Sequence, residues 1–165
     1  LQALVSKETS LWRRKLIKPN KKIMATRSVI ARIEATGVGG ANDTIKAVYC
    51  HSDGYLSNNG KILDQHYRDE DKVDELLAGG DMSSLKDTIK DTIFYHRDKK
   101  ESYERVKAST LKNETDLIEH AFSYYDAELL YMFAYGTWYV YDNSNKIGST
   151  SYQFIELDEA LYTVN

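Results

Sequence analysis

Residues 129–141 read LLYMFAYGTWYVY, and this stretch decides the fold. It consists of two runs of apolar and aromatic residues, 129–135 and 137–141, on either side of Gly136. Aromatic and β-branched residues are enriched in strands, and a glycine between two such runs is typical of a turn. The stretch therefore predicts a β-hairpin whose two faces are both apolar or aromatic.

A second hairpin is predicted near the start of the chain. Residues 28–35 and 44–51 each follow the period-two alternation of a strand, and residues 36–43 between them are rich in glycine, as loops are. Gly37 and Gly39 do not belong to a G-x-G-x-x-G pattern, and no helix follows them. The loop therefore does not predict a dinucleotide site.

Helices are predicted between and after the hairpins. Residues 113–125 begin at Asn113, a favoured N-cap residue, and carry an apolar stripe at helical spacing. A helix capped by Asn58 or Asn59, with His66 on its inner stripe, a helix capped by Asp69 or Asp71, and a final helix over 157–164 complete the pattern. We therefore expect an α+β fold, an antiparallel sheet built from two hairpins with three or more helices packed on one side of it.

Charge divides the chain into two parts. Residues 1–23 contain 7 basic and 1 acidic side chain, giving +6, so the remainder of a chain with net charge −3 carries −9. We interpret residues 1–23 as a basic N-terminal appendage and residues 24–165 as a single domain that starts at Met24. The acidic domain favours a basic protein surface over nucleic acid, which we expect to be contacted through the appendage if at all.

Cysteine content and hydropathy predict a compartment. Cys50 is the single cysteine, so no intrachain disulfide can form, and the chain suits a reducing environment. No apolar run approaches the ~20 residues of a membrane span. These features predict a cytoplasmic protein with no membrane partner.

Several side chains could carry chemistry. Cys50, His51, Asp53 and His66 follow one strand end closely, and nitrogen, sulfur and oxygen ligands of this kind hold metals. The alternative is structural, with His66 on the inner stripe of its helix and Asp53 in a turn. A Cys50 nucleophile would need a base on its own face, whereas His51 points the other way on a strand. We expect no bound metal and no cofactor.

The motifs, taken in order, resemble a family of small tailed-bacteriophage and prophage proteins without an assigned activity. The resemblance covers most of 24–98. This chain carries Ser52 and Leu56 where such proteins usually have tryptophan and proline, so stacking on that tryptophan is not carried over. The motifs are Thr26-Arg27-Ser28-x-Ile30, Tyr49-Cys50-His51-x-Asp53-Gly54-Tyr55, Gly60-x-x-Leu63-x-x-His66-Tyr67, Lys72-Val73-x-x-Leu76, Gly80-Asp81-Met82-Ser83-Ser84-Leu85 and Tyr95-His96-Arg97-Asp98.

The resemblance implies a phage protein that acts in the cytoplasm of a bacterial host, in host takeover or anti-defence. We expect a non-enzymatic binding protein that inhibits a host factor or sequesters a defence signal molecule. The alternative is a small metal-dependent hydrolase or nuclease that uses His51, Asp53 and His66. Tyrosines of 129–141 could add a recognition surface, unless helices or a homo-oligomer cover them. The predicted binding residues are His51, Asp53, Tyr55, His66, His96 and Arg97.

Overall fold

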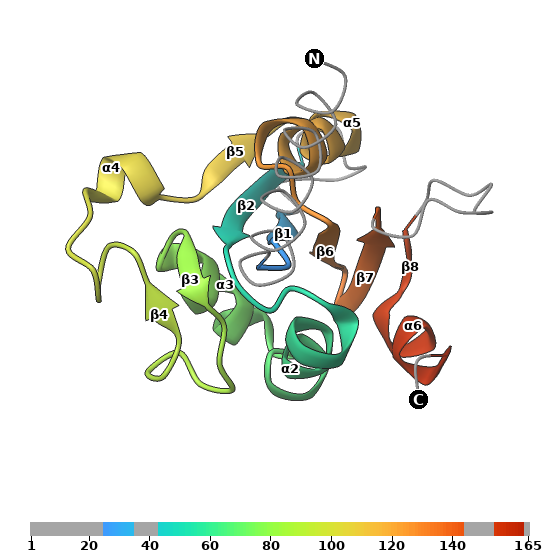
Figure 1. Ribbon diagram of the computed structural model, residues 1–165. Coiled ribbons are helices and arrows are strands. Elements are labelled where there is room, and N and C mark those ends of the chain that lie inside the picture. Colours follow the sequence, from blue (N-terminus) through green and yellow to red (C-terminus); the bar gives the residue numbers. More distant parts are fainter. Residues whose placement is uncertain (1–24, 35–42, 144–153, 164–165) are drawn as a thin grey trace, which may run out of the picture.

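The computed structural model describes residues 25–34, 43–143 and 154–163. One eight-stranded, mostly antiparallel sheet runs through the centre in the order β4-β3-β2-β1-β6-β7-β8, and β5 pairs with β2 outside this path (Figure 1). The strands are β1 (Ser28–Glu34), β2 (Thr44–Cys50), β3 (Met82–Ser84), β4 (Ile93–Phe94), β5 (Ser109–Leu111), β6 (Leu129–Ala134), β7 (Thr137–Asp142) and β8 (Ile155–Glu156).

The predicted α+β class is confirmed, and the sheet is larger than two hairpins. β1 pairs antiparallel with β2, and β6 pairs antiparallel with β7. The two pairs are joined by a parallel pairing of β1 with β6, in which Ile30 lies opposite Tyr131. The predicted appendage over 1–23 and the loop over 36–42 lie outside the described residues.

The turn between β6 and β7 explains why Gly136 follows Tyr135. Both residues have positive φ, 52° for Tyr135 and 80° for Gly136. Two consecutive left-handed residues form the hairpin turn whose twist matches that of the flanking strands, and glycine adopts this conformation without a steric penalty. The Tyr135 side chain projects from the turn and donates a hydrogen bond from its hydroxyl to Asp43 Oδ2 at 3.1 Å.

Helices and helical turns lie on both sides of the sheet. Figure 1 shows α5 separated from α2, α3 and α6 by the central strands. η1 and η2 are single π-helical turns that precede α2 and follow α5. The elements are η1 (Leu56–Gly60), α2 (Lys61–His66), α3 (Glu70–Ala78), α4 (Tyr103–Val106), α5 (Glu114–Glu119), η2 (His120–Tyr124) and α6 (Leu157–Thr163).

The cap predictions are partly confirmed. The Asp69 side chain accepts a hydrogen bond from the Asp71 N–H at the start of α3, and the Asn113 side chain accepts one from Asp116 at the start of α5. The prediction that Asn58 or Asn59 caps α2 is wrong, because neither side chain bonds to the start of that helix. Asn59 is instead buried and donates to Ser28 Oγ at 3.2 Å.

Two apolar clusters show that the prediction of a sheet covered on one side is wrong. One cluster joins Ile30, Val48 and Tyr131 to residues of α2, α3 and α6. The other joins alternate residues of the same strands to Leu117 of α5 and Ala121 of η2. All six residues of β6 are buried because both of its faces are covered. The aromatic series of β6 and β7 is therefore mostly core and not a recognition surface.

Within the described residues, no helix has the length and apolar character that crossing a membrane requires.

Candidate functional site

A buried carboxylate lies on the edge of β2 that faces away from β1. Along that edge β2 pairs first with β5, over Ile45–Ala47, and then with β3 at Cys50. Between these pairings the Tyr49 N–H donates to Asp81 Oδ1 at 2.8 Å. The Asp81 main chain donates to the Val106 carbonyl at 2.7 Å and accepts from the Tyr95 N–H at 3.1 Å. Asp81 therefore fills a gap in the ladder that a strand would otherwise fill.

The surroundings of Asp81 change its acidity. Burial raises the pKa of the Asp81 carboxyl to about 6, because a low-dielectric environment disfavours the ionised form. The hydrogen bonds from the Tyr49 N–H and from the Tyr125 hydroxyl, at 3.3 Å, oppose that rise in the pKa. Burial and then the Asp81 charge raise the pKa of Tyr125, so its hydroxyl keeps its proton and remains a donor.

A continuous series of five rings runs from the end of β2 to η2, and we call it the aromatic strip: His51, Tyr49, Tyr125, His120 and Tyr124. The Tyr49 hydroxyl and His51 Nδ1 share a hydrogen bond of 2.8 Å. Tyr49 and Tyr125 are stacked with centroids 4.7 Å apart, and the Tyr125 ring meets His120 edge-on at 4.9 Å. His120 and Tyr124 are stacked at 5.4 Å.

The aromatic strip is accessible to a partner. Four of its rings are half-buried, and Tyr124 is 73% exposed. Amphipathic rings held in contact with one another offer a large contact area at a low cost in conformational entropy. The strip is therefore suited to recognition, and its rings come from segments about 70 residues apart in the sequence.

A pocket of about 640 Å³ lies at the η2 end of the strip, between β5 and the α5–η2 segment. Its walls include Lys112, Asp116, Glu119, His120 and Tyr124. The His120 Nε2 atom is buried and has no hydrogen-bond partner among the described residues. Burial lowers the pKa of His120, which favours the neutral imidazole.

The loop after β2 places two predicted residues at the surface. Asp53 has a φ of 56°, a left-handed conformation that aspartate tolerates better than most residues, and its side chain is exposed. The Gly54 N–H donates to the Thr26 carbonyl at 2.7 Å, and a Cβ on Gly54 would lie 2.7 Å from that same oxygen. The glycine therefore lets the loop approach β1 closely, and Tyr55 beyond it is 44% exposed.

The other two predicted histidines contact residues outside the aromatic strip. The prediction that His66 belongs to the inner stripe of its helix is wrong, because Leu63 and Tyr67 are buried and His66 is exposed. Its Nε2 lies 3.6 Å from Asp87 Oδ2. His96 Nδ1 is 2.8 Å from the Glu101 carbonyl oxygen, and its ring meets Tyr103 edge-on.

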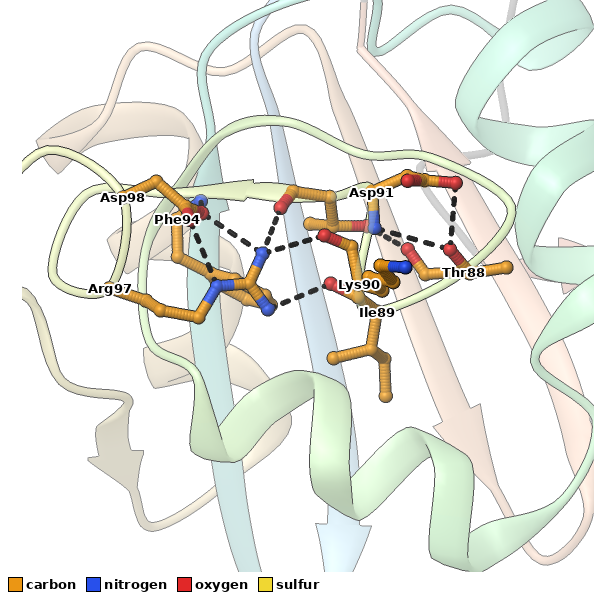
Figure 2. A network of polar contacts seen from close by, with 8 residues as sticks. Thr88, Ile89, Lys90, Asp91, Phe94, Arg97 and Asp98 are labelled. Atoms are coloured by element: carbon orange, nitrogen blue, oxygen red, sulfur yellow. Dashed lines mark hydrogen bonds and ion pairs between the residues drawn. The ribbon is translucent and has the colours of Figure 1, made fainter.

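Figure 2 shows that the Arg97 side chain bridges the 89–92 segment and Asp98 by hydrogen bonds. Its guanidinium donates to the carbonyls of Ile89 at 2.9 Å, Lys90 at 3.0 Å and Thr92 at 2.6 Å, and to both carboxylate oxygens of Asp98. The group also lies over the Phe94 ring, 4.9 Å from its centroid. These contacts give Arg97 a structural role, and a binding role stays a prediction.

The metal and thiol hypotheses gain no support from this geometry. Across 25–34, 43–143 and 154–163, no three or more His, Cys, Asp or Glu side chains are grouped closely enough to hold a metal ion, so His51, Asp53 and His66 are not such a group. Cys50 is fully buried, and burial raises the pKa of its thiol. A protonated, inaccessible thiol is a poor nucleophile.

Sequence reasoning missed Asp81, Tyr125, His120 and Tyr124 as site residues. Asp81 directly precedes β3, and its role depends on the pairing of that strand with β2 at Cys50. The pairing of Tyr125 with Tyr49 has no signal in a single sequence.

Comparison with protein-family models, with curated proteins and with solved structures finds no match to this chain.

Proposed function

We propose that this protein is a non-enzymatic bacteriophage accessory protein that binds a basic segment of a host protein through the aromatic strip and the adjacent Asp53–Tyr55 loop. The observation that carries the proposal is the strip itself, five contacting rings of which four are half-buried and one is largely exposed. The phage and anti-defence setting rests on the resemblance of the motif residues.

Charge favours a host protein over a defence signal molecule as the partner. Defence signals built on nucleotides carry phosphates, which acidic surroundings repel. The α5–η2 part of the strip has three carboxylates on it or next to it, those of Asp116, Glu119 and Asp126. Asp126 is paired with Arg27 at 3.2 Å. Lys112 and Arg27 are two cations against these three carboxylates, so the five groups carry a net charge of −1. A basic protein segment complements this surface, as it does the −9 charge of residues 24–165.

The same observations support binding over catalysis. The hydrolase alternative needs a grouped ligand set, and His66 pairs with Asp87 at 3.6 Å instead of joining His51. A nucleophile requires a base within hydrogen-bond reach, and the Cys50 thiol bonds to the Ser52 carbonyl and the Asn59 amide. The most exposed ring of the strip, Tyr124, is a group suited to making contacts.

The test compares binding residues with a matched exposed tyrosine. Asp53→Asn, Tyr55→Ala and Tyr124→Ala should each change the free energy of unfolding by under about 1 kcal/mol, because all three side chains are exposed. Activity in a bacterial growth-inhibition or phage-growth assay should fall at least about tenfold for Tyr124→Ala, as for a residue that carries about 1.4 kcal/mol of binding.

Tyr162→Ala is the control, since Tyr162 is 85% exposed on α6 and lies outside the strip. It should keep full activity. Full activity of all three strip and loop variants, at unchanged stability, would contradict the assignment of this surface.

A further inference from the structure

The pocket beside Tyr124 has the size of a ligand site and a defined set of walls. Its volume of about 640 Å³ falls within the range of about 300 to 1,000 Å³ that small-molecule sites occupy. One wall comes from β5 and Lys112, and the other comes from α5 and η2, which lie next to each other in Figure 1. The proposed partner surface ends at this pocket.

Two carboxylates in the pocket have no partner of their own. Asp116 and Glu119 are three residues apart on a helix, a spacing that places both side chains on one face. Neither carboxylate forms a hydrogen bond or ion pair within the described residues, since the bond at Asp116 is made by its backbone N–H to the Asn113 cap. With Lys112 as the one cation of the walls, the lining carries a net charge of −1.

Two rings in the pocket add to this preference. The Tyr124 ring is stacked on His120, with 6° between the ring planes, and most of the tyrosine remains exposed. A tyrosine face attracts a cation within about 6 Å of its centroid, and guanidinium groups are the commonest such cations. His120 supports this ring by stacking against it, whereas its own Nε2 atom is buried.

We propose that this pocket binds the guanidinium group of an arginine side chain, supplied by the basic segment of the partner. The proposal rests on the proposed function for the source of the arginine, but not for the chemistry of the pocket. A guanidinium has five N–H donors on a flat frame, which suits it to pair with Asp116 and Glu119 and to lie against the Tyr124 ring. An ammonium group satisfies fewer of these groups, because it is compact and strongly hydrated.

The test titrates the full chain with N-acetyl-arginine amide while backbone amide resonances are recorded by NMR. We expect saturable shifts centred on Glu119, His120 and Ser123, with a Kd on the order of 1 mM, as befits a single side chain. N-acetyl-citrulline amide has nearly the same shape without the charge and should bind at least about fivefold more weakly, as should N-acetyl-lysine amide. Equal binding of all three amides, or no shifts at the pocket, would overturn the proposal.

Matched variants separate the pocket from the overall charge. Glu119→Gln and Tyr124→Ala should each weaken arginine-amide binding at least about fivefold, whereas Glu114→Gln, on the same helix but outside the pocket walls, should not. The amide spectrum of each variant shows directly whether it is folded. An equal loss in Glu114→Gln would reduce the site to non-specific attraction and overturn the proposal.

The pocket and the proposed function can fail separately. If arginine amide does not bind but Tyr124→Ala still abolishes the growth phenotype, the pocket proposal is wrong and the strip remains the binding surface. If arginine amide binds as expected but no variant of the strip or loop changes the phenotype, the proposed function is wrong and the pocket remains a guanidinium site.

Discussion

Asp81→Ala is expected to be about 2 to 3 kcal/mol less stable than Asp81→Asn, measured as the free energy of unfolding in urea. Both substitutions remove the carboxylate charge, so their difference isolates its hydrogen bonds. Asparagine can still accept from the Tyr49 N–H and can donate to the Tyr125 hydroxyl oxygen, whereas alanine leaves a buried N–H of β2 without a partner. Equal stability of the two variants would show that Asp81 does not complete the β2 edge.

The same pair of variants predicts a pH dependence with a defined sign. The pKa of Asp81 is about 6 in the folded protein and about 3.8 in the unfolded chain, so the carboxyl is protonated in both states below about pH 4. The stability that the protonated form contributes is present there and is lost as the pH rises through 6. Relative to Asp81→Asn, the unsubstituted protein should lose on the order of 2 to 3 kcal/mol between pH 4 and pH 7.

Unfolding of both proteins at several pH values checks this result. Asp81→Asn should then be at least as stable as the unsubstituted protein at pH 7. A stability difference that does not vary between pH 4 and pH 7 would contradict a raised pKa at Asp81.

Arg97→Ala is expected to lower the free energy of unfolding by about 3 kcal/mol, with a fall in Tm of about 5 to 10 °C. Three main-chain carbonyls of the 89–92 segment lose their donor, and within the described residues they accept no other hydrogen bond that could replace it. Ile89 of this segment packs against the apolar cluster that contains the buried residues Phe94 and Leu85. Loosening it should therefore expose core surface to water.

Arg97→Lys should recover less than half of the lost free energy of unfolding. The planar guanidinium of arginine can donate to three carbonyls and a carboxylate together, whereas the compact ammonium group of lysine cannot. Arg105→Ala is the matched control: its guanidinium is exposed and bonds to Glu101 alone, at 3.1 Å, so the change should stay within about 0.5 kcal/mol. If Arg97→Ala kept its stability but lost activity, Arg97 would be a binding residue, as the sequence predicts, and not a structural one.

The fold predictions that were confirmed rest on local sequence patterns. The caps Asp69 and Asn113 act on residues two or three positions away, and the strand segments over 28–34 and 129–141 are visible as alternation or as apolar runs. The parallel pairing of β1 with β6 joins residues about 100 positions apart, and no local pattern encodes it. The sequence did hold one indication of an inner position in the sheet, because a strand that is apolar on both faces, such as β6, must be covered on both sides.

The candidate site divides in the same way. His51, Asp53 and Tyr55 were predicted because they are neighbours in a polar loop after a strand. Tyr124 and His120 were missed because their partners, Tyr125 and Tyr49, meet only in the folded chain. His66 was misplaced because two adjacent residues compete for the inner position, and Tyr67 takes it by donating from its hydroxyl to the Lys86 carbonyl at 2.8 Å.

Site-specific photo-crosslinking in living bacteria tests the central claim most directly. A p-benzoylphenylalanine side chain in place of Tyr124 should crosslink to one host protein, within a segment rich in arginine and lysine, as identified by mass spectrometry. The same side chain in place of Tyr162, which is more exposed, should not yield that product. The account predicts a crosslink that is specific to position 124 and is lost in the presence of Asp53→Asn or Glu119→Gln. The same product from both positions, or none from position 124 in cells where the protein is active, would contradict it.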